Sequence, residues 1–126
     1  MSWVVEIGDE FKREFDELRV DVHDEILVGT ELLKQLGPQL GRPNVDTLRD
    51  SRFPNMKELR FRVADGVWRV AFAFDAKRKA ILLIAGDKSG VSEQRFYREL
   101  IRKADIRFEA HLVRQKKKGD NIAYER

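Results

Sequence analysis

Apolar and polar residues alternate along two neighbouring stretches of the chain, and this alternation predicts a β-hairpin. Large apolar side chains occupy every second position from 59 to 63 and again from 68 to 74. A period of two is typical of strands that bury one face. Asp65-Gly66 stands between the two stretches, and it is a strong hairpin signal because a type I′ turn needs positive φ at both central residues. The pattern therefore predicts a two-residue turn at these positions.

A two-residue turn at this place fixes the pairing between the two strands. It puts Arg62 directly opposite Arg69. Arg60 follows on the same face, opposite Ala71, whose small side chain leaves room for a ligand. Like charges directly opposite each other destabilise a sheet, so the arginine pair predicts a surface that a polyanion completes. The alternative is that the two long side chains splay apart into solvent.

Helical spacing and capping signals predict the other elements. In chain order these are a strand at 3–7, a helix around 11–18, a helix at 22–36, a long loop at 39–56, a buried strand at 81–85 and a helix from Ser92 to Gln115. Gly37-Pro38 ends the second helix, and Ser92 is the predicted N-cap of the last one. If the third sheet strand is antiparallel, Ala85 approaches Arg69. The order β-α-α-β-β-β-α predicts an α+β fold with a small antiparallel sheet packed on helices.

Composition is that of a single globular domain. The chain has 126 residues, of which 42% are hydrophobic and 37% charged. We expect one domain at 1–115 and a basic, flexible tail at 116–126. The chain has no cysteine, which excludes disulfides, thiolate zinc sites and cysteine nucleophiles. The longest apolar run, 80–85, is too short to span a bilayer and no signal-peptide pattern is visible, so a cytoplasmic protein is expected.

Charge is distributed unevenly along the chain. Residues 1–50 carry 6 Lys and Arg against 12 Asp and Glu, a net charge of −6. Residues 51–126 carry 19 against 10, a net charge of +9. A basic half on a small domain suggests a nucleic-acid partner. The acidic half is expected to provide solubility, or to keep the basic surface from binding RNA indiscriminately.

Three short motifs follow one another along the chain: NMKELR at 55–60, WRVAFAFD at 68–75 and IAGDKSG at 84–90. With these motifs the chain resembles the phage-derived HigB-like toxins, members of the RelE/ParE superfamily of type II toxin–antitoxin systems. The resemblance covers about Trp3 to Leu112. It implies a RelE-like fold, in which a compact sheet is flanked by helices as in microbial ribonucleases.

The resemblance also implies an activity and its partners. It implies a metal-independent endoribonuclease that cleaves mRNA in the ribosomal A site and needs no metal or organic cofactor. The implied partners are a helix-turn-helix antitoxin, mRNA and the ribosome, with no small-molecule ligand and no membrane. We expect the antitoxin to cover or distort the basic face.

Cleavage of RNA without a metal makes three chemical demands on a site. The ribose 2′-OH attacks the neighbouring phosphorus, so the site needs a proton acceptor, positive charge for the phosphorane and a proton donor for the leaving oxygen. The only histidines, His23 and His111, fall on the second and last predicted helices, outside the basic strand face. The site is therefore expected to depend on cations and positioning.

The predicted catalytic residues are Arg62, Arg69 and Lys88. By resemblance Arg69 corresponds to the superfamily's strand arginine, and its guanidinium suits a bidentate grip on the transition-state phosphate. Lys88 lies in the Gly-Asp-Lys-Ser segment, where relatives carry a basic active-site residue, and is expected to hold phosphate or exchange protons. The alternative for Lys88 is an ordinary exposed turn lysine.

Four further residues are predicted to bind RNA: Arg60, Lys57, Arg52 and Tyr97. Lys57 lies about 16 Å from Arg62 if one strand carries both, so we expect it to contact RNA away from the reacting phosphate. Tyr97 either stacks on a base, transfers a proton or packs in the core. Phe53 stands where relatives often carry histidine, and it can stack on a base but cannot transfer a proton.

Two other functions remain open from the sequence. A ParE-like toxin shares the fold and inhibits DNA gyrase without nuclease chemistry; the trio Arg62, Arg69 and Lys88 argues against it. A non-catalytic RNA- or protein-binding module of the same fold is the second, and Phe53 is the feature that favours it.

Overall fold

The computed structural model describes the backbone of residues 2–124 and the side chains up to Lys118. Its elements are β1 (Val4–Ile7), α1 (Lys12–Asp16), α2 (Val20–Leu36), the 3-10 turn η1 (Gly37–Gln39), β2 (Val45–Thr47), β3 (Met56–Val63), β4 (Gly66–Phe74), β5 (Lys79–Asp87) and α3 (Glu93–Tyr124). The strands form one sheet in the order β1-β5-β4-β3-β2. The α+β fold expected from the sequence is confirmed.

The sheet is mixed, so the prediction of a purely antiparallel sheet is wrong at one edge. β2, β3, β4 and β5 pair antiparallel, whereas β1 runs parallel to β5. No tight turn ties β1 to its neighbour, so its direction follows from how α1 and α2 pack back on the sheet. The predicted loop at 39–56 also contains the three-residue edge strand β2, which is too short to show a period of two.

The β3–β4 turn lies one residue earlier than the sequence predicts. Val63 pairs with Gly66, and the turn residues are therefore Ala64, with φ +52°, and Asp65. Gly66 begins β4, where a Cβ would lie 2.7 Å from the indole nitrogen of Trp68. Close packing of Trp68 thus requires this glycine, which the prediction had assigned to the turn.

The pairing of the arginines changes with the turn. Arg69 faces Arg60, and Arg62 faces Val67. The predicted pairing of Arg62 with Arg69 is therefore wrong, as is that of Arg60 with Ala71. Because the register moves by two residues, the side chains keep the face that the sequence predicts.

A β-bulge in β5 adjusts the third strand. The predicted register holds where Phe72 faces Leu82, but an irregularity follows between Ala71 and Phe72. Beyond it Gly86, not Ala85, lies opposite Arg69. A bulge adds one residue to one strand of a pair, and nothing in the apolar run 80–85 signals where that extra residue falls.

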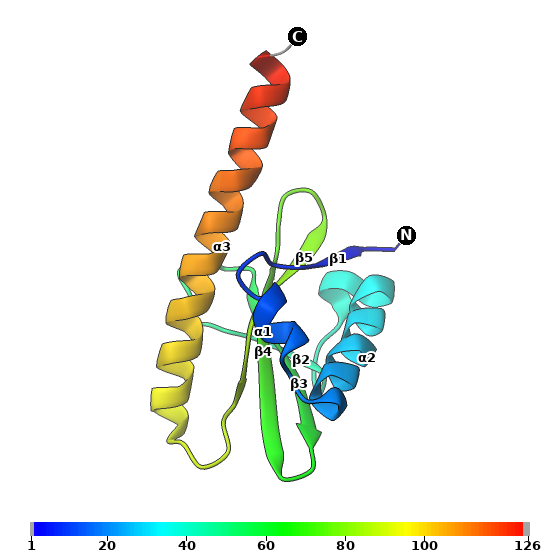
Figure 1. Ribbon diagram of the computed structural model, residues 1–126, viewed down its shortest axis with the longest axis vertical. Helices are drawn as coiled ribbons and strands as arrows, with labels where there is room; N and C mark the ends of the chain where they lie inside the picture. The colour runs from blue at the N-terminus through cyan, green and yellow to red at the C-terminus, as the bar shows by residue number, and fades with distance from the viewer. Residues whose placement is uncertain (1, 125–126) are drawn as a thin grey trace.

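Helices cover both faces of the sheet (Figure 1). The core under α1 and α2 includes Phe11, Phe15, Val22, Ile26, Leu33, Leu59, Val70 and Phe72. The core under α3 includes Met56, Ala71, Ala73, Ile81, Leu83, Leu100, Ala104 and Phe108. Gly86 lets the start of α3 approach closely, because a Cβ there would lie 3.0 Å from the ring of Phe96. This approach brings the first turns of α3 over the arginine-bearing face of β3 and β4.

The last helix begins as predicted and continues beyond the predicted end. The hydroxyl of Ser92 accepts a hydrogen bond from the Arg95 amide at 3.3 Å, which confirms the N-cap. α3 extends through Tyr124 and past the end of the sheet (Figure 1). The flexibility of residues 116–126 stays a prediction, and 125–126 lie outside the described residues. Within the described chain, every helix is too short or too polar to cross a bilayer.

Gly37 ends α2 with φ +54°, and this conformation makes a prediction about stability. We expect Gly37→Ala to lower the free energy of unfolding by about 3 kcal/mol, because a side chain is strained there and its Cβ would overlap the indole of Trp3. Gly41→Ala is the control, since its Cβ would meet no atom within 4 Å. Urea unfolding of both variants checks this, and equal losses would contradict it.

Candidate active site

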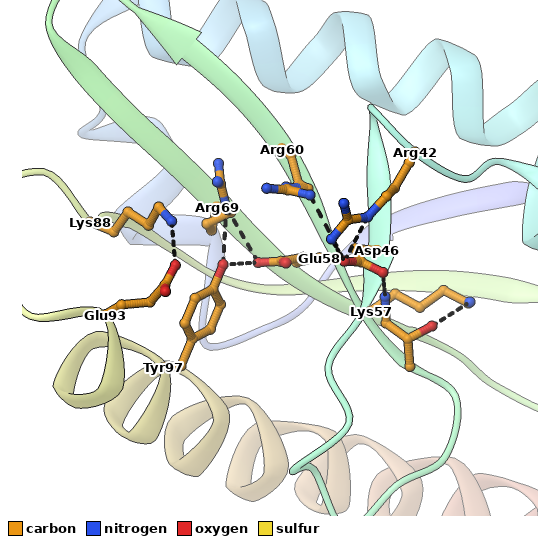
Figure 2. Close-up of polar contacts among 10 residues, drawn as sticks. Arg42, Asp46, Lys57, Glu58, Arg60, Arg69, Lys88, Glu93 and Tyr97 are labelled. Carbon is orange, nitrogen blue, oxygen red and sulfur yellow. Dashed lines mark hydrogen bonds and ion pairs between the residues drawn. The ribbon is translucent and has the colours of Figure 1, made fainter.

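A buried three-residue network joins the sheet to α3. Glu58 and Arg69 are only 4% and 6% exposed, and they come from neighbouring strands. The hydroxyl of Tyr97, on the first turns of α3, donates a hydrogen bond to Glu58 Oε1 at 2.8 Å and accepts one from Arg69 Nε at 3.1 Å (Figure 2). Arg69 Nε lies 3.5 Å from Glu58 Oε1. A carboxylate, a guanidinium and a phenol thus meet at one point.

Burial changes the proton affinity of this network. Desolvation raises the pKa of Glu58 above its ordinary 4.5, against the opposing effects of the Tyr97 hydrogen bond and the Arg69 charge. Burial also raises the pKa of Tyr97 above 10.0, so its hydroxyl remains a donor to Glu58. A carboxylate with raised pKa is a good proton acceptor near neutral pH. Glu58 is therefore chemically suited to be a general base.

An open groove of about 820 Å³ lies above this network. Its lining comes from the β2 region, β3 and α3, and includes Arg42, Asp46, Arg49, Glu58, Arg60, Glu93, Tyr97, Arg98 and Arg102. Five arginines in one groove make it a suitable binding site for a phosphate backbone. The loop that the sequence analysis predicted between α2 and β3 supplies one wall.

Asp46 holds two of the groove arginines. Its Oδ2 lies 2.7 Å from Arg42 Nη2 and 3.9 Å from Arg60 Nη1 (Figure 2). A second opening of about 570 Å³ is lined by Arg42, Arg60, Arg62 and Arg69 together with Pro43 and Phe61. Arg60, Arg62 and Arg69, the three arginines predicted to share one face of the sheet, therefore line one surface. Arg62 lies at its exposed side.

Lys88, a predicted catalytic residue, lies beside the network. Its backbone amide donates to the Val67 carbonyl at 2.8 Å. Its Nζ lies 2.8 Å from Glu93 Oε1 and 5.8 Å from the centre of the Tyr97 ring (Figure 2). The lysine is thus an ordered neighbour of the groove.

Two predicted RNA-binding residues lie apart from this cluster. Lys57 points to the opposite face of the sheet, where it faces Phe72 and its Nζ donates to Thr47 Oγ1 at 3.4 Å. Arg52 pairs with Glu109 on α3, twelve residues and about 18 Å along the helix from Tyr97. Any contact of either residue with RNA would lie outside the groove.

Phe53, which stands where the sequence analysis expects histidine in relatives, is also turned away from the groove. Phe53 packs edge-on against Phe108 with ring centres 5.0 Å apart. The two histidines are likewise outside the groove: His23 packs on Phe15, and His111 Nε2 lies 3.1 Å from Asp75. In the described part of the chain, no three His, Cys, Asp or Glu side chains are placed to hold a metal ion.

Three residues of the cluster were missed from the sequence, namely Glu58, Asp46 and Arg42. The sequence did contain a signal for Glu58. It stands two residues before Arg60 and four before Arg62, so it lies on the same strand face, the one that packs under α3. Arg42 and Asp46 had no comparable signal, since their place depends on the short strand β2.

Comparison with known proteins gives the family. The family model described as phage-derived protein Gp49-like matches residues 13–109. The chain belongs to this Gp49-like family.

Two curated relatives of this family member come from Mycobacterium tuberculosis (strain ATCC 25618 / H37Rv). The protein named "Putative toxin HigB3" is 45% identical over 102 residues, which are 81% of this chain and 87% of the relative. The protein named "Putative toxin HigB2" is 41% identical over 109 residues, or 79% of this chain and 54% of the relative. The chain thus spans about half the length of HigB2.

Two solved structures share the fold of this HigB-type chain. A mutant of the E. coli toxin RelE in the free state superposes with a TM-score of 0.55 at 12% identity, over 82% of this chain and 97% of that one. The archaeal RelE–RelB complex from Pyrococcus horikoshii OT3 gives a TM-score of 0.52 at 17% identity, over 72% of this chain and 100% of that one. These similarities establish a RelE-like fold, as the sequence predicted.

The phenol that bridges Glu58 and Arg69 leads to a prediction for Tyr97→Phe. At neutral pH we expect the free energy of unfolding to fall by about 1–3 kcal/mol, because buried polar groups lose a hydrogen-bond partner. The loss should be smaller in acid, where Glu58 is protonated and Arg69 is the only charged group that loses a partner, and should grow as the pH rises above 4.5 and Glu58 ionises. Urea unfolding from pH 4 to 7 measures both. An equal loss at every pH would contradict the bridging role.

Proposed function

We propose that this HigB-type toxin is a metal-independent endoribonuclease that cleaves mRNA on the ribosome. The observation that carries the proposal is the pairing of a proton acceptor with a cation: Glu58 lines the basic groove, Arg69 lines the adjoining second opening, and Tyr97 joins the two. Ribonuclease chemistry without histidine needs both groups close to one phosphate. The toxin names of the two relatives and the RelE-like fold support the same proposal.

In the proposed reaction Glu58 accepts the proton of a ribose 2′-OH. The 2′-oxygen then forms a bond to the adjacent phosphorus, and the bond from phosphorus to the 5′-oxygen breaks. The products are a 2′,3′-cyclic phosphate and a 5′-OH. Arg60 and Arg69 face each other across the strands and hold the non-bridging oxygens, where two guanidinium groups stabilise the phosphorane charge.

The leaving 5′-oxygen needs a proton, and Lys88 is the proposed donor. Its ammonium group lies beside the Tyr97 ring and therefore near the same phosphate. Tyr97 positions the acceptor, because its hydroxyl holds Glu58 and Arg69 in a fixed relation. Arg62 binds the neighbouring phosphate at the rim of the groove. Each of the three predicted catalytic residues thus keeps a role, and Glu58 joins them.

The proposal includes partners. A helix-turn-helix antitoxin would neutralise the toxin, and the RelE–RelB complex among the structural neighbours supports an antitoxin partner. The mRNA held on the ribosome is the proposed substrate. The proposed place of action is the cytoplasm, where translated messages are found.

Mapping of mRNA ends after induced expression tests this function. We expect cuts within translated messages for the wild type, and a loss of about two to four orders of magnitude in cleavage for Glu58→Gln and Arg69→Ala. Arg60→Ala should also reduce cleavage, and its partly exposed side chain makes loss of folding less of a concern. Lys34→Ala is the control, because that cation is on α2, which covers the other face of the sheet.

Two results would contradict the nuclease proposal. Intact messages with arrested growth and failing DNA replication would favour gyrase inhibition. Intact messages with normal growth would favour a binding module. Thermal unfolding of each purified variant separates loss of chemistry from loss of fold.

The pH dependence of cleavage tests the role of Glu58. A general base must be ionised, so kcat/KM should rise with pH through an inflection above 4.5, the ordinary value of the glutamate pKa. Single-turnover cleavage of a ribosome-bound message from pH 4.5 to 8 measures it. Glu58→Gln should remove this acid limb from its residual activity. An unchanged limb in the variant would assign the proton acceptor elsewhere.

A further inference from the structure

Arg42 and Arg60 in the groove, and Lys88 beside it, are already paired with carboxylates of the same chain. Asp46 holds Arg42 and Arg60, and Glu93 holds Lys88 (Figure 2). The Arg42 hydrogen bond lowers the pKa of Asp46, and the Lys88 hydrogen bond lowers that of Glu93. Both carboxylates are therefore ionised at neutral pH. A phosphate that approaches Arg42, Arg60 or Lys88 therefore meets a cation that already has a carboxylate partner.

Exposure separates these two carboxylates from the one on the floor. The side chain of Glu58 is 6% exposed, whereas those of Asp46 and Glu93 are 27% and 71% exposed. Asp46 lies on an edge strand, and Glu93 is the first residue of α3. Either side chain can turn into solvent without disturbing the core. Glu58 has no such freedom, because Tyr97 and Arg69 enclose it.

We propose that Asp46 and Glu93 are specificity-determining residues, which compete with RNA phosphates for Arg42, Arg60 and Lys88. Free RNA must displace both carboxylates with the binding energy of the groove alone. A message held on the ribosome has further contacts with the toxin or is fixed in position, so it displaces them more easily. The inference rests on the proposed function and gives a physical reason for a preference for ribosome-bound over free RNA.

The competition has an electrostatic signature. When protein cations neutralise RNA phosphates, counterions leave the RNA, and affinity therefore falls as salt rises. For single strands, the slope of log affinity against log salt is about −0.7 per neutralised phosphate. Each neutralised phosphate releases a counterion from the RNA, but the displaced carboxylate takes up a cation, so the net release is smaller. The wild-type salt dependence should thus be weaker than the number of groove cations suggests.

The test measures binding of a short single-stranded RNA that carries a 2′-O-methyl group at each ribose, so that no 2′-OH can attack and no cleavage occurs. Asp46→Asn and Glu93→Gln each remove one charge and keep the shape of the side chain. Asp21→Asn and Glu31→Gln are the matched controls, since they break ion pairs with Arg19 and Lys34 outside the groove. Fluorescence anisotropy between about 50 and 300 mM salt gives the affinity and its salt dependence, a range chosen around the roughly 0.1 M scale of screening.

Each groove variant should bind the oligonucleotide about fivefold more tightly than its control at low salt. Its plot of log affinity against log salt should be steeper by up to about 0.7. Equality of groove variants and controls in both quantities would overturn the proposal. Tighter binding in all four variants alike would also overturn it, because it would reflect net charge alone.

Cleavage assays then separate this inference from the function on which it rests. Asp46→Asn and Glu93→Gln should raise the rate on ribosome-free RNA relative to the rate on a ribosome-bound message. If wild type cleaves neither substrate, the proposed function fails whatever the binding data give. If wild type cleaves the ribosome-bound message but the ratio is unchanged in both variants, the function stands and the competition by Asp46 and Glu93 is wrong.

Discussion

The structure depends on one buried ion pair that is bridged by a phenol. Glu58 and Arg69 lie on adjacent strands under α3, and Tyr97 connects both to the helix. Removal of one partner from a buried pair leaves an uncompensated charge and typically costs about 3–5 kcal/mol. The groove floor is therefore also a structural joint. Packing of α3 and placement of the reactive groups cannot vary independently.

Two backbone features set the geometry of this joint. The bulge in β5 brings Gly86 opposite Arg69, and the missing side chain of Gly86 gives Phe96 room to pack. α3 then approaches closely enough for the Tyr97 hydroxyl to reach the β3–β4 surface. A larger residue at 86 would move the helix away, and the phenol would lose one or both partners. The bulge in β5 therefore helps to determine whether Tyr97 can reach Glu58 and Arg69.

The sequence predicted the face of the sheet better than its register. Alternation placed Arg60, Arg62 and Arg69 on one surface, and this holds because a shift of two residues preserves the face. The register depended on whether Gly66 is a turn residue or the strand residue that makes room for Trp68. The local sequence pattern does not distinguish these two possibilities. Resemblance gave the family and fold, but Lys57 shows its limit: the NMKELR motif spans both faces of β3, and only Glu58 and Arg60 of its six residues line the groove.

The carboxylates of the cluster differ in the physical role that burial permits. Glu58 is enclosed, so desolvation raises its pKa and makes it a proton acceptor that stays in place. Asp46 and Glu93 are solvated, so their hydrogen bonds keep them ionised and exchangeable. The first of these exchangeable groups, Asp46, pairs with Arg42 of the acidic half of the chain and with Arg60 of the basic half. After folding, this carboxylate and an RNA phosphate therefore compete for arginines that come from both halves of the sequence.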